Sequence, residues 1–345
     1  SGNGFIDWRG ILFNGNHAVT PRTVGQLHFA SPPGPGWAHP ESGSFDDPRM
    51  LGKDGRAYGP LPREWTRYKG TYKHGDRIIS CYSVGYADVF ETHSVDVGDR
   101  STVWTRTLNI GKSTHDLTMR VAPEIQADAA VSGGLTLESD QGYLVVRIPA
   151  QQTPTRFSVR IASKGVGIDE LQRFASEAED LTPLTLGGPG QWPLQVTEPS
   201  IGNDNGPFAV DTISRPTDNP WKSRLRMSGL DFFDDGNSLV ACCCDGDVWV
   251  VDGIDALDKP LTWKRIASGL FHPLGIKIVR GRIYVTCRDQ IVILNDLNGD
   301  GETDYYFIKM SGPQGIVSKN TEALRTAIGV KADSQKPFEL KDAEN

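Results

Sequence analysis

Residues 229–255, GLDFFDDGNSLVACCCDGDVWVVDGID, decide the fold of the C-terminal half, because a similar pattern returns at 275–298, GIKIVRGRIYVTCRDQIVILNDLN. Each unit reads as strand, tight turn, strand, turn, strand. The two units start about 46 residues apart, and this period is typical of one four-stranded propeller blade. The aligned pairs are Gly229 with Gly275, Gly236 with Gly281, Cys243 with Cys287, and Asp245 with Asp289.

This repeat predicts a partial β-propeller of about two blades over residues 209–306. Natural propellers need at least about four blades to close a ring. We therefore expect either that the chain is a fragment or that the fold closes in another way.

The remaining sequence also favours a mainly β protein. Residues 1–181 carry β-branched and aromatic residues between Gly, Asp and Pro, which predicts an N-terminal β-sandwich-like domain. One helix is expected at 165–180, where apolar residues recur with helical spacing. The stretch 182–208 is dense in Pro and Gly and predicts an interdomain linker. Residues 307–345 do not continue the repeat and are expected to form a poorly packed tail.

Composition limits the partners. The formal net charge is -7 and the pI is about 5.5, which argues against nucleic acid, since phosphate binding needs a basic surface. The apolar runs are too short to span a bilayer. The chain opens on SGNGFIDWRG without a signal peptide, so we expect a mature or excised segment. Five cysteines form neither a zinc pattern nor the C-x-x-C-H haem motif.

Six long motifs occur in order along the chain: TPRTVGQLHFASPPGPGWAHP, GPLPREWTRYKGTYKHGDRIISCYSVG, DNPWKSRLRMSGLDFFDDG, DGDVWVVDGID, LTWKRIASGLFHPLGIKIV and YVTCRDQIVILNDLNGDGETDYY. Together they resemble one family of large exported, multidomain haem-binding proteins of planctomycetes and related bacteria. In these proteins an uncharacterised β-rich domain (the DUF6797 type) precedes a propeller similar to the soluble glucose/sorbosone dehydrogenases, and a c-type cytochrome module often follows. The resemblance implies an extracytoplasmic location and a role in carbohydrate oxidation or handling, with further propeller and cytochrome domains in a full-length protein.

The stretch 295–304, NDLNGDGETD, predicts a calcium loop, because oxygen-bearing side chains alternate around Gly299 and Gly301. The expected ligands are the side chains of Asp296, Asn298 and Asp300, the backbone carbonyl of Glu302, and Asp304 directly or through water. The twelfth position of an EF-hand would be Phe307 rather than a bidentate Glu, and a strand precedes the loop, so this is not an EF-hand. The alternative is a hairpin turn that binds no ion.

Four further residues are candidate ligand-binding groups. Asp245 and Asp289 occupy equivalent turns of the repeat and could face a propeller channel, and Arg288 could contact an anionic cofactor or sugar hydroxyls. His272 could serve as the general base of a sugar dehydrogenase. The alternatives are turn-closing aspartates and a structural or exposed histidine.

Other clusters have ordinary structural explanations beside functional ones. Cys242 and Cys244 share one strand face and Cys243 the other, which favours core packing over a metal site or a Cys243–Cys287 disulfide. Trp37, His39, Arg63, Trp65 and His74 lie in or beside a long Pro/Gly-rich loop. They are expected to anchor that loop, with a sugar-stacking surface as the alternative. The glycine-rich GGPGQW lacks the context of a phosphate loop.

Two functions follow from these patterns. The first is a non-catalytic binding or structural module of an exported, carbohydrate-related protein with a structural calcium ion. The second is the sugar-oxidising part of a quinoprotein-like dehydrogenase, which would take pyrroloquinoline quinone and pass electrons to a c-type cytochrome. The first is preferred, because two blades and the isolated His272 do not complete a catalytic pocket.

Overall fold

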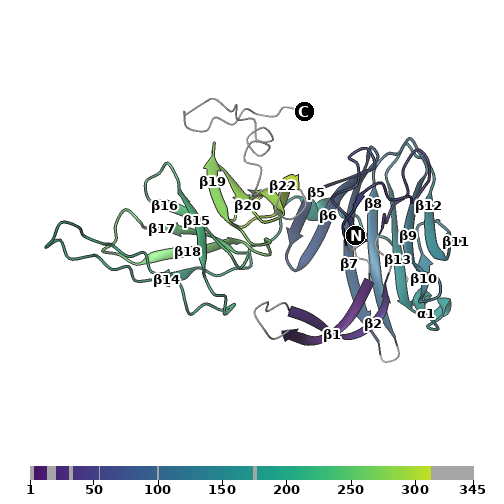
Figure 1. Ribbon diagram of the computed structural model, residues 1–345, viewed down its shortest axis with the longest axis horizontal. Coiled ribbons are helices and arrows are strands. Elements are labelled where there is room, and N and C mark those ends of the chain that lie inside the picture. Colours follow the sequence, from purple (N-terminus) through teal and green to yellow (C-terminus); the bar gives the residue numbers. More distant parts are fainter. Residues whose placement is uncertain are drawn as a thin grey trace. The chain divides into compact units, whose positions relative to one another are not determined.

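The computed structural model describes residues 4–13, 21–30, 34–53, 55–98, 101–173 and 177–311. The chain divides into two compact units. Unit 1 comprises Ser1–Tyr68 and Ile78–Pro183, and unit 2 comprises Lys69–Arg77 and Leu184–Asn345. The described chain is mainly β, and its sheets are antiparallel ladders in both units (Figure 1).

Unit 1 contains two antiparallel sheets that share one core. The larger runs in the order β10-β13-β8-β7-β6, and the smaller in the order β11-β12-β9. Leu108 and Phe157 from the first sheet and Met119 and Val146 from the second belong to one buried apolar cluster. The strands are β6 (Arg77–Val84), β7 (Ala87–Val97), β8 (Thr102–Ile110), β9 (Leu117–Pro123), β10 (Ala127–Val131), β11 (Leu137–Asp140), β12 (Tyr143–Ile148) and β13 (Thr155–Ser163).

Unit 1 also contains two separate strand pairs and one short helix. β1 (Gly4–Phe13) pairs with β2 (Pro21–Ala30), and β3 (Met50–Leu51) pairs with β4 (Ala57–Tyr58). α1 (Ile168–Arg173) is shorter than the helix predicted at 165–180. Asn109 explains part of the difference, because its side chain bonds the Glu179 carbonyl and the Leu181 amide. Those backbone groups are thereby used outside a helix.

Unit 2 contains the predicted repeat as two consecutive four-stranded antiparallel meanders, β15–β18 and β19–β22. Gly236 and Gly281 occupy equivalent first turns with φ of 73° and 75°, a conformation that favours glycine. The strands are β15 (Met227–Phe232), β16 (Ser238–Cys243), β17 (Val248–Asp252), β18 (Leu261–Ala267), β19 (Gly275–Val279), β20 (Arg282–Thr286), β21 (Gln290–Asn295) and β22 (Tyr305–Ser311).

The two meanders share an apolar core that includes Val240, Cys242, Val285 and Val292. Each meander gains one further strand. β14 (Gln195–Thr197) pairs with β18, and the Gly70–Tyr72 part of β5 (Thr66–His74) pairs with β22. None of the sheets formed by the described residues closes into a barrel. The partial β-propeller therefore stays a prediction.

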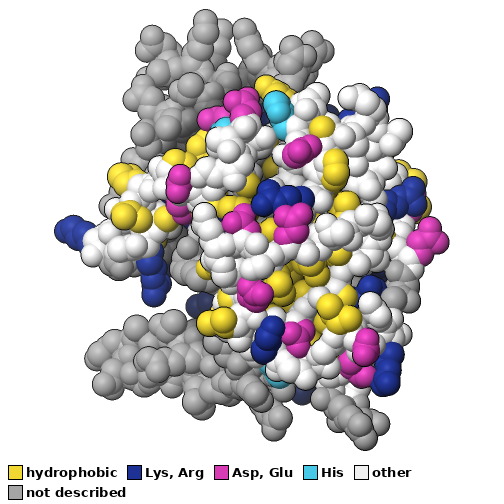
Figure 2. Space-filling model, turned by 90° about the vertical axis from the view of Figure 1, so that its right-hand side faces the viewer, with side chains coloured by type: hydrophobic (Ala, Val, Ile, Leu, Met, Phe, Trp, Pro, Cys, Tyr) yellow, Lys and Arg dark blue, Asp and Glu magenta, His cyan; other side chains and the backbone are white. Residues whose placement is uncertain are grey.

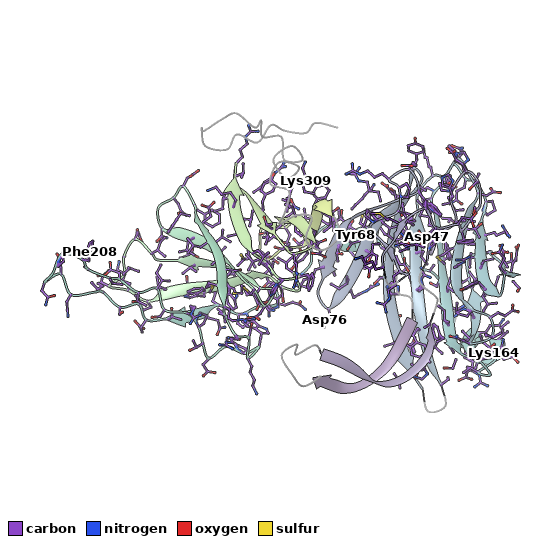
Figure 3. The ribbon with its side chains drawn as sticks, in the orientation of Figure 1. Asp47, Tyr68, Asp76, Lys164, Phe208 and Lys309 are labelled. Atoms are coloured by element: carbon purple, nitrogen blue, oxygen red, sulfur yellow. The ribbon has the colours of Figure 1, made fainter. Side chains whose placement is uncertain are left out.

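Two segments near the expected domain boundaries contain regular structure. The predicted linker 182–208 contains a 3-10 turn (Thr182–Thr185) and β14, and its middle part is held by hydrogen bonds described below. Strand β22 extends to Ser311, beyond the boundary expected at 306, because it continues its ladder with β21. Phe208 lies at the tip of the excursion that follows β14 and is 86% exposed (Figure 3).

Candidate functional site

The acidic loop, residues 296–304, connects β21 to β22 and is shaped by its own side chains. Both carboxylate oxygens of Asp296 accept backbone amides, from Gly299 at 2.7 Å and from Gly301 at 2.8 Å. These glycines have φ of 79° and 82°, which permits the tight winding. The Asn298 side-chain oxygen accepts the Asp300 amide at 3.1 Å. The loop is thus preorganised by hydrogen bonds between acidic side chains and backbone amides.

Two loop residues capture the backbone of Gly188. Asp304, which is 4% exposed, accepts the Gly188 amide at 2.7 Å with one carboxylate oxygen and the Leu297 amide at 2.8 Å with the other. The Asn298 amide group donates to the Gly188 carbonyl at 2.6 Å. Gly188 therefore has both of its backbone polar groups bonded to the acidic loop.

Glu302 continues the contact along the same segment. Its Oε1 accepts the Gln191 amide at 2.9 Å, the Trp192 amide at 2.6 Å and the Lys264 ammonium at 2.9 Å. The Lys73 ammonium lies 3.5 Å from its Oε2. Burial alone would raise the pKa of Glu302, but the hydrogen bonds from Lys264 and the two amides outweigh it, so the pKa is lowered. Glu302 is a buried, ionised hub.

The Trp192 ring lies against two cations. The Lys73 ammonium is 4.5 Å from the ring centroid and the Arg265 guanidinium 4.8 Å. Arg265 also lies 4.8 Å from the Trp221 ring and forms a buried ion pair of 2.6 Å with Asp247. The tryptophan is thereby fixed by its backbone amide and by its ring.

The glycines of residues 187–192, which we call the glycine-rich segment, permit this close approach. A Cβ on Gly187 would lie 2.8 Å from the Cβ of Asn298, and Gly187 has φ of 113°. On Gly188 it would lie 2.7 Å from the Cα of His74, and on Gly190 it would lie 3.2 Å from Asp300 Oδ2. The glycines that a phosphate loop would use to approach a ligand here approach protein atoms instead.

The five predicted calcium-binding residues lie together in the loop, and the predicted side-chain ligands have protein partners. Each carboxylate oxygen of Asp296 and Asp304 accepts one backbone amide. The side chain of Glu302 binds Lys264, a contact that the sequence did not indicate. Within the ranges that the structure describes, no group of three or more His, Cys, Asp or Glu residues is arranged to hold a metal ion. Calcium at this loop stays a prediction.

The predicted ligand-binding residues gather at one end of the two meanders. The loop after β18 bridges them, because the Leu270 amide donates to the Gly246 carbonyl at 3.2 Å and the Leu274 amide to the Thr286 carbonyl at 2.8 Å. His272 lies in this loop, is exposed and has φ of 52°. The turns that carry Asp245 and Asp289 therefore flank the loop that carries His272.

Their chemical environments differ. Asp245 forms a 2.8 Å ion pair with Arg226, and this hydrogen bond lowers its pKa. Burial raises the pKa of Asp289, whose Oδ1 is buried without a hydrogen-bond partner among the described residues. Arg288 is exposed, and its backbone amide donates to the Phe271 carbonyl at 3.0 Å. The turns are equivalent in the repeat, but only Asp245 is neutralised by a neighbour.

All five cysteines are free thiols, and four of them are buried. Cys242 and Cys287 belong to the core shared by the meanders, while Cys243 belongs to a second cluster with Trp249 and Trp263. Burial raises the pKa of Cys243 and of Cys287 to about 12, so neither is a reactive thiolate near neutral pH. The core-packing interpretation is confirmed for Cys242 and Cys243, whereas Cys244 lies beyond the end of β16 and is half-buried.

In unit 1 the aromatic residues of the long loop are anchors. Trp37 is 6% exposed and Trp65 is 3% exposed, and the Trp65 indole donates to the Trp37 carbonyl at 3.0 Å. Their rings are therefore not available as a sugar-stacking surface. On the face of the molecule shown in Figure 2, acidic and basic side chains are interspersed with hydrophobic ones.

A buried ionic network lies beneath that loop. Glu91 accepts the Tyr82 hydroxyl at 2.7 Å and the Arg106 Nε at 2.7 Å, and His93 Nε2 lies 3.1 Å away. Burial would raise the pKa of Glu91, but Arg106 and His93 outweigh it and hold the pKa well below its usual range. Nothing in the sequence pattern had marked this group, although Arg106 and His93 are directly opposite in the β7–β8 register.

Comparisons with known proteins find a similarity in the N-terminal part. A family model described as Domain of unknown function (DUF6797) matches residues 1–91. This confirms the DUF6797 part of the resemblance, while its propeller and dehydrogenase-like part stays a prediction. A search of curated proteins found no match. Among the helices of the described residues, none is both long and apolar enough to cross a membrane.

Proposed function

We propose that this chain is a non-catalytic, β-rich binding and structural module of an exported, carbohydrate-related protein. The proposal rests on one observation: the charged groups of the acidic loop and Lys264 bind other parts of the protein. Asp304, Glu302 and Lys264 use their hydrogen bonds to hold the glycine-rich segment in place. Groups so engaged stabilise the fold and are poorly placed to exchange protons with a substrate.

A structural calcium ion in the acidic loop is part of this proposal. Calcium takes six to eight oxygen ligands, and a carboxylate oxygen has about two lone pairs. Asp296 and Asp304 use each oxygen for one amide, which leaves lone pairs for a cation. These free lone pairs support calcium as part of the proposal, although the acidic groups of the described residues are not clustered as a ready-made metal site. The ion would neutralise Asp296 and Asp300 and tighten the turn.

Thermal unfolding tests the ion directly. The melting temperature of the chain is compared in calcium, in magnesium and in chelator, with Asp296→Asn as the variant and the exposed Asp234→Asn as the matched control. We expect calcium to raise the melting temperature of the wild type and of the control, with a much smaller rise in Asp296→Asn. Identical melting temperatures with calcium and chelator would remove the ion from the proposal.

Carbohydrate binding is tested with a panel of neutral and acidic oligosaccharides by calorimetry. Binding that survives in the presence of chelator would place the sugar site away from the acidic loop. If no oligosaccharide of the panel binds, the sugar-binding part of the proposal is rejected. The remaining function is then a structural module that binds partner domains, such as further propeller or cytochrome domains of a longer protein. The exported setting belongs to the same proposal and rests on the resemblance to the large exported proteins.

One observation favours a second function, that of a sugar-oxidising quinoprotein-like propeller. Asp245, His272 and Asp289 lie on turns and a loop at one end of the two meanders. The test is reduction of an artificial electron acceptor by aldoses after addition of pyrroloquinoline quinone and calcium. Activity that His272→Asn abolishes would support this function, and no activity with any sugar would reject it for this chain.

A further inference from the structure

Arg160, in the middle of β13, is a buried cation without a counter-charge. It is 3% exposed, and its Nε is buried with no hydrogen-bond partner among the described residues. Two other arginines of unit 1 have acidic partners: Arg106 lies 2.7 Å from Glu91 and Arg156 lies 3.0 Å from Asp180. A buried charge without a partner is strongly disfavoured, so Arg160 needs an explanation.

The strand register places hydroxyl groups beside Arg160. Arg160 is directly opposite Thr105 on β8, and Thr105 is directly opposite Ser94 on β7. Directly opposite residues point to the same face of a sheet. In the next row of that face, the hydroxyls of Thr107 and Ser158 lie 3.2 Å apart. Thr105 and Thr107 are partly exposed and Ser94 is exposed, so this side of the face is open to solvent.

The other side of Arg160 is apolar. It is directly opposite Ala130 on β10, and Ala130 packs with Val103, Ala162 and Leu171 of α1 in a small buried cluster. These side chains offer no acceptor for the guanidinium. Among the described residues, the polar neighbours of Arg160 in the strand register therefore lie on the hydroxyl side.

Two acidic residues of unit 1 that lie near this face already have partners. Asp128 binds Lys164 at 3.0 Å and the Gly165 amide at 2.8 Å. Asp180 binds Arg156, as described above. Burial lowers the pKa of Arg160, and no acid opposes this effect. The charge of Arg160 is thus uncompensated by the described part of unit 1.

We propose that Arg160, together with the hydroxyls of Thr105 and Thr107, binds a small oxyanion: a carboxylate, sulfate or phosphate group. A guanidinium presents donors in a planar fork that matches two oxygens of such a group. Threonine hydroxyls add donors that rotate to suit the anion. This inference is independent of the proposed calcium loop and of sugar binding, since it concerns another unit and another chemistry.

The test is anion-dependent thermal unfolding of the full chain at constant ionic strength, with sulfate, phosphate or glucuronate replacing chloride. The variant is Arg160→Met, and the matched control is Arg156→Met on the same strand and face. Sulfate also stabilises proteins generally by exclusion from their surface, so only the difference between variants counts. We expect the sulfate-induced rise at about tenfold excess over Kd to be larger in wild type and Arg156→Met than in Arg160→Met by about 3 °C.

Equal rises in all three proteins would overturn the proposal. So would a lower melting temperature of Arg160→Met in chloride alone, because that would reveal a structural partner for the guanidinium. Arg160→Lys provides a second measurement, since it keeps the charge and loses the planar fork. Calorimetry should show at least about tenfold weaker binding of the preferred anion in Arg160→Lys, and unchanged affinity would contradict the assignment. The sulfate, phosphate and glucuronate arms distinguish a tetrahedral anion from a carboxylate.

Discussion

Each unit of this chain buries one glutamate among cations, and the two networks are built differently. Glu91 draws its partners from neighbouring strands of one sheet, with Tyr82 on β6 and Arg106 on β8. Glu302 joins Lys73, Trp192 and Lys264, which are far apart in the sequence. The Glu91 network therefore joins strands that are already paired by backbone hydrogen bonds. The second network holds three separate segments together, and these segments are not neighbouring strands of one sheet.

Acid should have the largest effect, because it acts on both networks. The folded-state pKa of Glu91 and of Glu302 lies below the ordinary value of 4.5. Each therefore contributes stability above the unfolded pKa, and this contribution is lost as pH falls through the folded pKa. We expect unfolding free energy to be level from neutral pH to about pH 5 and to fall below about pH 4.5. Urea unfolding at a series of pH values measures this, and a curve that is flat down to pH 3 would contradict it.

Glu91→Gln should destabilise unit 1 by about 4 kcal/mol, because it leaves Arg106, whose side chain is 16% exposed, without its counter-charge. The control is Glu138→Gln, whose partner Arg147 is 50% exposed, and it should cost under about 1 kcal/mol. Denaturant unfolding provides both values. Equal effects of the two variants would show that burial does not strengthen the Glu91 network.

Glu302→Gln should destabilise unit 2 by about 3 kcal/mol. The effect is smaller than for Glu91, because the side chain of Lys264 is 22% exposed and can recover hydration. Asp245→Asn is the matched control in unit 2, since its ion pair with Arg226 is exposed. If Glu302→Gln unfolds at the same denaturant concentration as this control, the Glu302 network does not contribute to stability.

Gly188→Ala should cost about 2 kcal/mol, since a new Cβ must displace backbone atoms in a packed region. The added Cβ would lie 2.7 Å from the Cα of His74, whereas at Gly275 it would meet nothing within 4 Å. Gly275→Ala is therefore the control and should change stability by less than about 1 kcal/mol. Thermal unfolding of both variants compares them, and a neutral Gly188→Ala would argue that the glycine-rich segment is loosely held.

The local patterns of unit 2 could be predicted from the sequence. The aligned Gly236 and Gly281 mark equivalent turns, and the period of the repeat reflects the length of one meander. The acidic loop was also placed correctly, after β21. These features depend on neighbours in the chain, where turn chemistry and alternation act directly.

The partners of Glu302 could not be predicted in this way. Lys73 and Lys264 lie in strands and carry no spacing that relates them to the acidic loop. The glycines at 187, 188 and 190 were the one signal, since they mark a close approach of backbone. The sequence did not indicate what approached them. Arg160 was missed for a similar reason, because its isolation depends on which residues the register places opposite it.

Amide hydrogen exchange of the glycine-rich segment tests the central claim, that the acidic loop holds this segment by hydrogen bonds. The amides of Gly188, Gln191 and Trp192 donate to Asp304 and Glu302. We predict that these amides exchange slowly in the wild type and much faster in Glu302→Gln and Asp304→Asn, while the core amides of β16 keep their protection. Rapid exchange of these amides in the wild type, or rates unchanged in both variants, would contradict the account.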